Sequence, residues 1–206
     1  MTAVTLYLAS ASPRRREILD QLGLEYQLLP QDIDESRLAG ESPGDYVCRL
    51  AIAKAEAALA TVPTSGHCAC LGSDTTVVCG NEIFEKPRDE ADARRILQCL
   101  SGRSHDVLTA VALVSADHSD VRLSRSRVTF RALSEDEISA YWFTGEPADK
   151  AGAYGIQGLG AMFIKEIKGS YSSIMGLPVL ETVELLSAVG ITAQEILKTA
   201  VSEQKP

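Results

Sequence analysis

The sequence predicts an α/β fold with a mixed sheet. Strand-like apolar segments alternate along the chain with segments that have the pattern of helices. In the middle of the chain, two strand-like segments, 106–115 and 121–131, flank a polar turn at 117–120 and can pair as a hairpin. The 206 residues are 45% hydrophobic and 23% charged, which is the balance of a globular protein. We therefore expect a single domain over 1–206, which can consist of two small lobes that share one core.

The elements before the hairpin follow from their boundary residues. Residues 4–9 are apolar and indicate a buried strand. Ser12 can cap a helix that has Pro13 at its first position and Gly23 beyond its end. The other elements expected here are a strand over 24–29, a loop over 31–43, a helix over 45–60, a loop over 61–70, a strand over 70–79 and a helix over 89–100.

The elements after the hairpin begin with a capped helix. Ser134 precedes it, Glu137 completes a capping box, and Gly145 marks its end. The remaining elements expected are a glycine-dense segment over 152–160, a strand over 162–167, a turn over 169–173 and a last helix from Pro178 to near Gly190.

Charge and cysteine usage limit the class of protein. Twenty basic against 28 acidic residues give a net charge of -8, which argues against bulk binding of nucleic acid or an anionic membrane. No stretch approaches the roughly 18 apolar residues of a membrane span, and the first residues do not resemble a signal peptide. The odd number of cysteines, five, suggests reduced thiols in a cytoplasmic protein.

The segment from Ser10 to Arg16 is the first candidate site. A strand, a tight turn and a helix N-terminus form an anion site, because the first N–H groups of a helix lack partners within it. Three arginines in the first turn conflict with the positive end of the helix dipole. A bound polyphosphate would remove this conflict, whereas the alternative is three arginines that point into solvent.

Lys54 is the second candidate. It falls in the middle of an apolar helix stripe formed by Val47, Leu50, Ala51 and Ala58. Its side chain therefore either extends to the rim of the stripe or points into a cleft to meet negative charge.

Asp74 and Glu35 supply two carboxylates. Asp74 lies in an apolar strand, where an unpaired carboxylate is costly, so it pairs, binds metal, does acid–base work or caps a loop. Glu35 lies in an acidic stretch that on its own suits a solvated loop. Two hard oxygen ligands suit Mg²⁺, which keeps several waters and binds through substrate phosphates; Mn²⁺ is the alternative.

Two further features are weaker alone. Lys86 lies in a proline-containing turn, where a solvated side chain is the simple alternative. Gln157 is the one amide side chain of the glycine-dense segment, and an amide can both donate and accept. The segment itself is either a loop whose backbone approaches a ligand closely or a plain surface loop. Two other sites are not supported. A zinc site formed by His67, Cys68, Cys70 and Cys79 would not have a common ligand spacing. A Ser–His–Asp triad built on His105 or His118 would lack the nucleophile elbow of such hydrolases.

Six segments together resemble the Maf family of nucleoside triphosphate pyrophosphatases. They are LASASPRRREIL, LGSDTTVV, EKPRD, LSGRSHDVLTAVAL, GEPADKAGAYGIQG and GSYSSIMGLP, and they span nearly the whole chain in the family's order. The resemblance implies an inosine-triphosphatase-like fold with an elongated mixed sheet, flanking helices and a deep cleft between two lobes. It also implies a cytoplasmic homodimer and a divalent cation.

The resemblance assigns residues by position. It places phosphate binding on Ser10, Ser12, Arg14 and Arg15. It places catalytic groups on Glu35, Lys54, Asp74 and Lys86, with Asp74 as proton acceptor. The positions of Arg15, Thr75 and Gln157 separate subgroups, and here they resemble those of the dTTP/UTP subgroup. The implied reaction converts the triphosphate to monophosphate and pyrophosphate, with Mg²⁺ on Glu35 and Asp74.

Two other functions remain as alternatives. One is a nucleotide-binding regulator of septum formation with little turnover, a role also linked to the family. The other is a phosphatase, which would release orthophosphate instead of pyrophosphate. The full set of carboxylates and lysines favours a pyrophosphatase, since a sensor needs no group to activate water.

Overall fold

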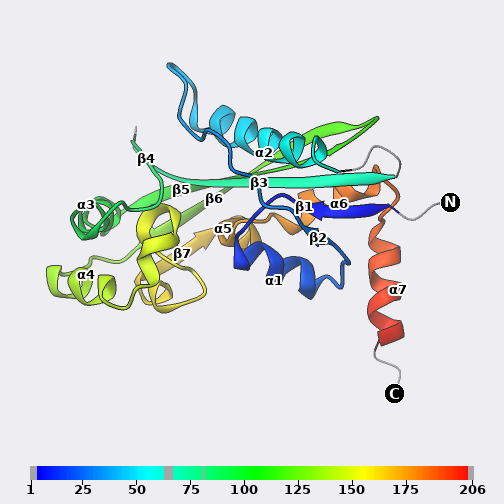
Figure 1. The fold of residues 1–206 in the computed structure, drawn as a ribbon. Coiled ribbons are helices and arrows are strands. Elements are labelled where there is room, and N and C mark those ends of the chain that lie inside the picture. The colour runs from blue at the N-terminus through cyan, green and yellow to red at the C-terminus, as the bar shows by residue number, and fades with distance from the viewer. Residues whose placement is uncertain (1–3, 63–66, 81, 204–206) are drawn as a thin grey trace. The chain divides into compact units, whose positions relative to one another are not determined.

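A computed structural model describes residues 4–62, 67–80 and 82–203 of the chain. Its strands and helices alternate, as the sequence predicts (Figure 1). The strands are β1 Thr5–Leu8, β2 Gln27–Leu28, β3 Cys68–Cys79, β4 Glu82–Phe84, β5 Ser104–Ser115, β6 Ser119–Phe130 and β7 Ile164–Lys168. The α-helices are α1 Pro13–Gln21, α2 Pro43–Leu59, α3 Glu90–Leu100, α4 Glu135–Trp142, α5 Tyr171–Met175, α6 Val179–Ser187 and α7 Ala193–Glu203. Three short 3₁₀ helices are η1 Glu146–Asp149, η2 Ala151–Ala153 and η3 Leu159–Phe163.

The strands form one mixed sheet, which confirms the predicted fold class. Their order is β2-β1-β3-β5-β6-β7, and β4 pairs with β3. β1 is parallel to β2 and β3, whereas β4 and β7 run antiparallel to β3 and β6. β5 and β6 are joined by a short turn, closed by a bond from the Ser115 N–H to the His118 carbonyl (2.7 Å). The central hairpin is therefore as expected.

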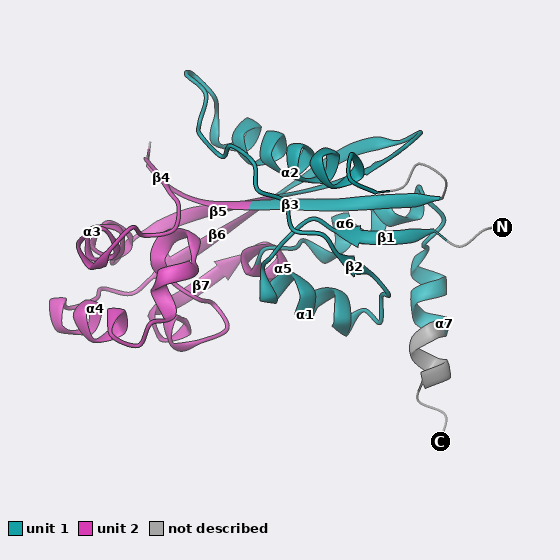
Figure 2. Ribbon diagram, in the orientation of Figure 1, with its two compact units in different colours: residues 1–74, 110–124, 176–206 teal, residues 75–109, 125–175 magenta. Residues whose placement is uncertain are grey.

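The chain divides into two compact units (Figure 2). Unit 1 contains residues 1–74, 110–124 and 176–206, and unit 2 contains 75–109 and 125–175. β3, β5 and β6 each contribute residues to both units.

Unit 1 packs helices on both faces of its strands. Helices α1 and α2 lie on opposite sides of β1 and β3 in Figure 1. The apolar stripe of α2 is buried, and so are the inward residues of α1 and β1. Helix α1 begins at Pro13 as predicted, whereas α2 begins at Pro43, two residues before the start expected at 45. Ser12 is at the N-cap of α1, but its side chain makes no capping hydrogen bond.

Unit 2 has its own hydrophobic cluster. β3 and β4 contribute Val77 and Phe84, and the amphipathic helix α3 contributes Ile96. Helix α4 carries the predicted capping box, with Ser134 and Glu137 each accepting the other's N–H. Gly145 follows in the left-handed conformation (φ 78°), which ends the helix as predicted.

Several predictions of element boundaries or element type are wrong. The strand expected over 24–29 has only two residues, because β2 pairs with β1 at Gln27 and Leu28 alone. β3 begins at Cys68 inside the loop expected over 61–70, of which 63–66 lie outside the described residues. The turn expected over 169–173 contains the start of helix α5, and helix α7 was not expected.

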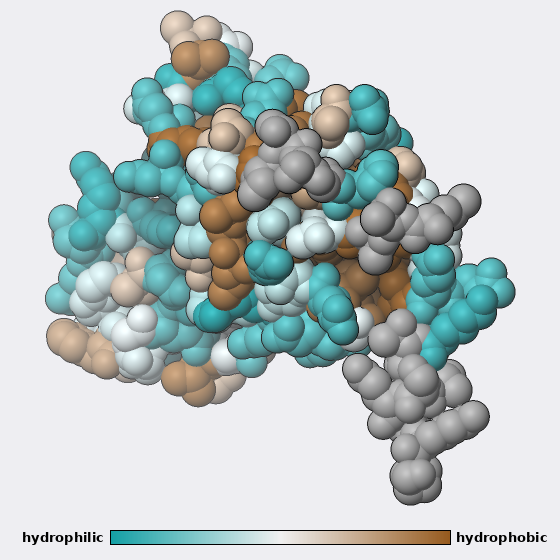
Figure 3. Space-filling view, turned by 45° about the vertical axis from the view of Figure 1, so that its right-hand side comes forward, coloured by the Kyte–Doolittle hydropathy of each residue, from teal (hydrophilic) through white to brown (hydrophobic). Residues whose placement is uncertain are grey.

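Within the described residues, no helix is long and apolar enough to cross a membrane. All five cysteines are free thiols. On the face shown in Figure 3, hydrophilic side chains are interspersed with hydrophobic strips.

Candidate active site

Lys54 joins two carboxylates in unit 1. It projects from α2 and is only 8% exposed. Its Nζ lies 2.7 Å from Asp74 Oδ1 and 2.6 Å from Glu35 Oε1. Of the two alternatives left open for Lys54, the structure shows the one in which its ammonium group meets negative charge, and it shows the buried carboxylate of Asp74 in an ion pair.

Gly72 allows β3 to approach α2 closely enough for this contact. A Cβ at Gly72 would overlap the carbonyl oxygen of Ala51 and lie 2.8 Å from the backbone nitrogen of Ala55. Both are backbone atoms of the helix that carries Lys54, so they cannot move aside independently. The absence of a side chain at residue 72 thus places Asp74 beside Lys54.

The Gly72→Ala variant should be destabilised by about 1–3 kcal/mol, because the added methyl forces the strand away from the helix. Its turnover should fall as well, since the same shift separates Asp74 from Lys54. Urea unfolding and steady-state kinetics would measure both effects. Gly44→Ala is the control, because its Cβ would meet chiefly the flexible end of Leu123 at 3.2 Å. Equal stability of the two variants would contradict the prediction.

Burial dominates the electrostatics of Asp74. Desolvation raises the pKa of its carboxyl group, while the charge and hydrogen bond of Lys54 and the charge of Arg15 act in the opposite direction. A carboxylate with a raised pKa is a stronger base than an exposed one. Such a group is suited to accept a proton near neutral pH.

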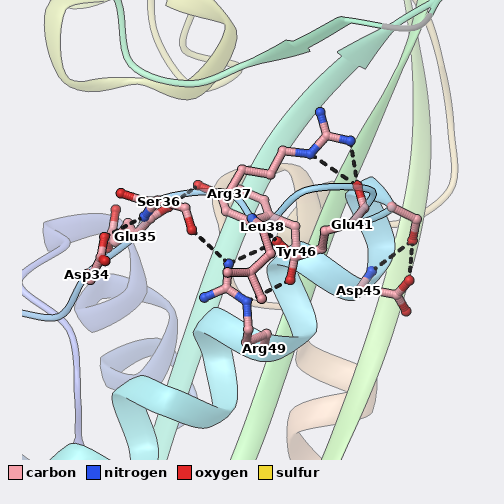
Figure 4. Close-up of polar contacts among 10 residues, drawn as sticks. Asp34, Glu35, Ser36, Arg37, Leu38, Glu41, Asp45, Tyr46 and Arg49 are labelled. Atoms are coloured by element: carbon pink, nitrogen blue, oxygen red, sulfur yellow. Dashed lines mark hydrogen bonds and ion pairs between the residues drawn. The ribbon is translucent and has the colours of Figure 1, made fainter.

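Glu35 is held by a network at the start of α2 (Figure 4). The Tyr46 hydroxyl donates to the carbonyl oxygen of Glu35 (2.9 Å). Arg49 donates to both carboxylate oxygens of Glu41 (2.6 and 2.9 Å) and to the carbonyl oxygen of Ser36 (3.0 Å). Hydrogen bonding by Arg49 lowers the pKa of Glu41 to about 2, so this pair stays ionised at neutral pH. These bonds fix a loop that has no regular secondary structure.

Arg15 folds back over the turn between β1 and α1. Its Nε donates to the Gly176 carbonyl (2.8 Å), and one terminal nitrogen donates to Ser10 Oγ (2.9 Å). Ser10 Oγ also accepts the Ser12 N–H (3.2 Å). Arg15 therefore does not simply point into solvent, and Arg14 is half-buried beside it. The structure brings together Ser10, Ser12, Arg15, Glu35, Lys54 and Asp74 in unit 1.

The other predicted residues, Thr75, Lys86 and Gln157, belong to unit 2. Lys86 is exposed and precedes the buried Pro87. Thr75 is half-buried and its hydroxyl lies 3.0 Å from that of Thr109. Gln157 is exposed on the glycine-dense segment.

Glu146 organises the segment that carries Gln157. Its carboxylate accepts the N–H groups of Leu159 (2.7 Å) and Gly160 (3.0 Å) and the hydroxyl of Tyr141 (2.7 Å). A Cβ at Gly158 would overlap this carboxylate, and one at Gly160 would lie 2.6 Å from the Tyr141 hydroxyl oxygen. The glycines thus allow close approach to the backbone of this segment, and the groups that approach it are the Glu146 carboxylate and the Tyr141 hydroxyl.

Several of these supporting residues were missed by sequence reasoning. Glu41 and Arg49 are eight positions apart in a loop and a helix, a spacing that carries no motif. Glu146 and Thr109 do lie inside two of the Maf-like segments, so their place in the sequence was a usable signal.

The donor set is compatible with a divalent cation. Glu35 and Asp74 bring two carboxylates to one ammonium group, a set that leaves one net negative charge. Among the described residues no group of three or more His, Cys, Asp or Glu could hold a metal ion. Two carboxylates are the kind of ligand set through which Mg²⁺ is usually bound, together with substrate phosphates.

Comparison with known proteins identifies relatives along almost the whole chain. A dTTP/UTP pyrophosphatase of Saccharophagus degradans is 55% identical over 186 residues, covering 89% of this chain and 88% of that protein. Another, from Shewanella sp. (strain MR-7), is 53% identical over 193 residues and covers 91% and 100%. A third, from Salmonella typhimurium, is 51% identical over 183 residues and covers 89% and 92%.

A structural comparison matches the Ham1 protein of Staphylococcus aureus at 14% identity and a TM-score of 0.45, covering 61% of this chain and 71% of that one. The family model for Maf-like proteins matches residues 5–189. With the six motif segments in order and half of the sequence identical to that of such relatives, the chain belongs to the Maf family.

Proposed function

We propose that this protein hydrolyses dTTP and UTP to the nucleoside monophosphate and pyrophosphate. The observation that carries the proposal is the buried ammonium of Lys54 held between Asp74 and Glu35. Relatives that are 51–55% identical over about nine tenths of the chain bear the name of this activity.

Charge compensation is the first task of the site. Arg15 and Lys54 are cations fixed by hydrogen bonds or ion pairs, so they need little reorganisation to face a triphosphate. Ser10 and Ser12 shape the turn before α1, whose N-terminus favours an anion. Arg14 and Lys86 add positive charge, as the family resemblance implies. A Mg²⁺ ion held by Glu35 and Asp74, or Mn²⁺ in its place, would neutralise charge on the phosphate oxygens.

Asp74 is the proposed general base. Its carboxylate takes a proton from a water molecule while the water oxygen forms a bond to the α-phosphorus. The bond from that phosphorus to the bridging oxygen breaks, and pyrophosphate leaves with the bonding electrons. Lys54 holds Asp74 in place through the 2.7 Å contact and limits how far burial raises the pKa of the carboxyl group.

Base recognition is assigned to Thr75 and Gln157, two of the positions that separate the subgroups of the family. The imide edge of uracil and thymine presents one N–H donor between two acceptors. A neutral amide such as Gln157 can match both signs, and a wrong base would leave polar groups unpaired.

The reaction is tested with purified protein, Mg²⁺ and dTTP or UTP in ¹⁸O-labelled water. The products expected are the monophosphate, which carries the label, and unlabelled pyrophosphate. Orthophosphate as the only first product would establish a phosphatase instead. Nucleotide binding without steady-state pyrophosphate release would favour a regulator with little turnover.

Gln157→Glu should lower kcat/KM for dTTP and UTP by roughly 5- to 150-fold, because a carboxylate can no longer donate to an imide oxygen. A guanine edge presents donors and tolerates the new acceptor better, so the pyrimidine-to-purine ratio should fall. The measurement is kcat/KM for dTTP, UTP, CTP, GTP and ATP. An equal loss on all five would show that Gln157 supports the loop and does not read the base.

The assembly and location belong to the same proposal. The family resemblance supports a homodimer in the cytoplasm, and five free thiols accord with a reducing compartment. Sedimentation equilibrium tests the first point, and a profile of a single protomer would exclude it.

A further inference from the structure

A relay of hydrogen bonds runs from Thr75 through Thr109 to Ser173, all within unit 2. The hydroxyl oxygens of Thr75 and Thr109 are 3.0 Å apart across neighbouring strands. Thr109 Oγ1 donates to the carbonyl oxygen of Ser173 at 2.8 Å. Thr109 is fully buried, whereas Thr75 is half-buried.

The relay has only one consistent direction. A carbonyl oxygen can only accept, so the single hydroxyl hydrogen of Thr109 is committed to Ser173. Thr75 must then donate its own hydrogen to Thr109. The oxygen of Thr75 has only lone pairs left, so it meets any further partner as an acceptor.

We propose that Thr109 is a positioning residue that fixes Thr75 as an acceptor and thereby selects an imide base over cytosine. This inference rests on the proposed function, in which Thr75 faces the base. The ring nitrogen of uracil or thymine between its two carbonyl groups bears a hydrogen and donates to Thr75. The corresponding nitrogen of cytosine has a lone pair, so two acceptors would face each other and both would lose a hydrogen bond.

The same acceptor could instead meet a sugar hydroxyl. UTP and CTP carry the same ribose, so a sugar contact would affect both equally. The ratio of kcat/KM for UTP to that for CTP therefore reports on the base contact alone.

Thr109→Val is the decisive variant, because valine has the shape of threonine without the hydroxyl. Thr75 can then turn its hydrogen toward cytosine, so the UTP-to-CTP ratio should fall by about 5- to 20-fold, the scale of one hydrogen bond. Thr109→Ser keeps the relay and should retain the ratio within about 2-fold. The matched control is Thr129→Val. It removes a hydroxyl on another strand of unit 2, where Thr129 Oγ1 lies 2.8 Å from Ser104 Oγ.

The outcomes separate this inference from the proposed function. Wild-type protein without a preference for UTP over CTP would overturn the proposed function itself. A wild-type preference that persists in Thr109→Val, with both substrates slowed by the same factor, would show that the relay is only structural. Thr75→Val gives the same test from the other end without removing the bond between Thr109 and Ser173, and an unchanged ratio there also overturns the inference.

Discussion

Asp74→Asn is expected to lower kcat for dTTP and UTP by about 10²-fold or more, the scale of a lost general base. An amide keeps the size of the side chain but cannot accept the proton of the attacking water. The fold should survive, because the variant also removes the desolvation cost of a carboxylate that is only 8% exposed. Lys54 keeps its contact with Glu35 in the variant. Single-turnover kinetics with labelled nucleotide would measure the chemical step directly.

A matched control for this change is Asp106→Asn. Asp106 is also ion-paired, with its Oδ1 atom 2.9 Å from Arg127 Nε, but it has no place in the proposed reaction. Its kcat should stay within about 2-fold of the wild-type value. Near-wild-type turnover in Asp74→Asn would show that the carboxylate is structural and would remove the proposed base.

The parts of the fold that sequence predicted are those with a local physical signature. The capping box of Ser134 and Glu137 fixes the start of α4 within four residues of chain, so the local sequence is enough to predict where this helix begins. Helix α7 has the same signature, because Thr192 accepts the Glu195 N–H and the Glu195 carboxylate accepts the Thr192 N–H. Thr192 and Glu195 have the spacing of a capping box in the sequence, although no helix was expected there.

Other elements depend on contacts that are distant in sequence. The strand over Gln27–Leu28 is set by its pairing with β1, so its two-residue length could not be predicted locally. The first turn of α5 contains Ser172 and Ser173, residues typical of turns, and the Ser173 N–H is accepted by Ser170 Oγ (3.2 Å). Serine side chains of this kind often stabilise turns, but at this position the Ser170 hydroxyl caps a short helix.

The candidate site divides in the same way. A charged residue within an apolar stripe and another within an apolar strand were each conspicuous, and the structure joins Lys54 to Asp74. The residues that support them act through backbone approach, as Gly72 does, or through pairing across a loop, as Glu41 and Arg49 do. Neither kind of contact leaves a periodic pattern in the sequence.

Lys54→Met is expected to reduce both activity and stability. Methionine suits the apolar stripe of α2, so the helix itself should form. The variant leaves the buried Asp74 without the cation 2.7 Å away, and breaking a buried pair in this way typically costs about 3–5 kcal/mol. Without Lys54 the pKa of Asp74 rises further, because the ammonium is the largest influence that lowers it. A protonated Asp74 cannot act as a base, so kcat should fall by about 10²-fold or more.

The double variant Lys54→Met/Asp74→Asn separates the two effects. Removing both charges eliminates the uncompensated carboxylate, so the free energy of unfolding in urea at pH 7 should recover most of the loss, while turnover stays low. Lys168→Met, at an exposed lysine that pairs with Glu166, is the control and should change neither quantity measurably. If the double variant were no more stable than Lys54→Met, the buried pair would not be coupled. Lys54 would then act on the phosphate groups alone, and the role assigned to it in holding Asp74 would be wrong.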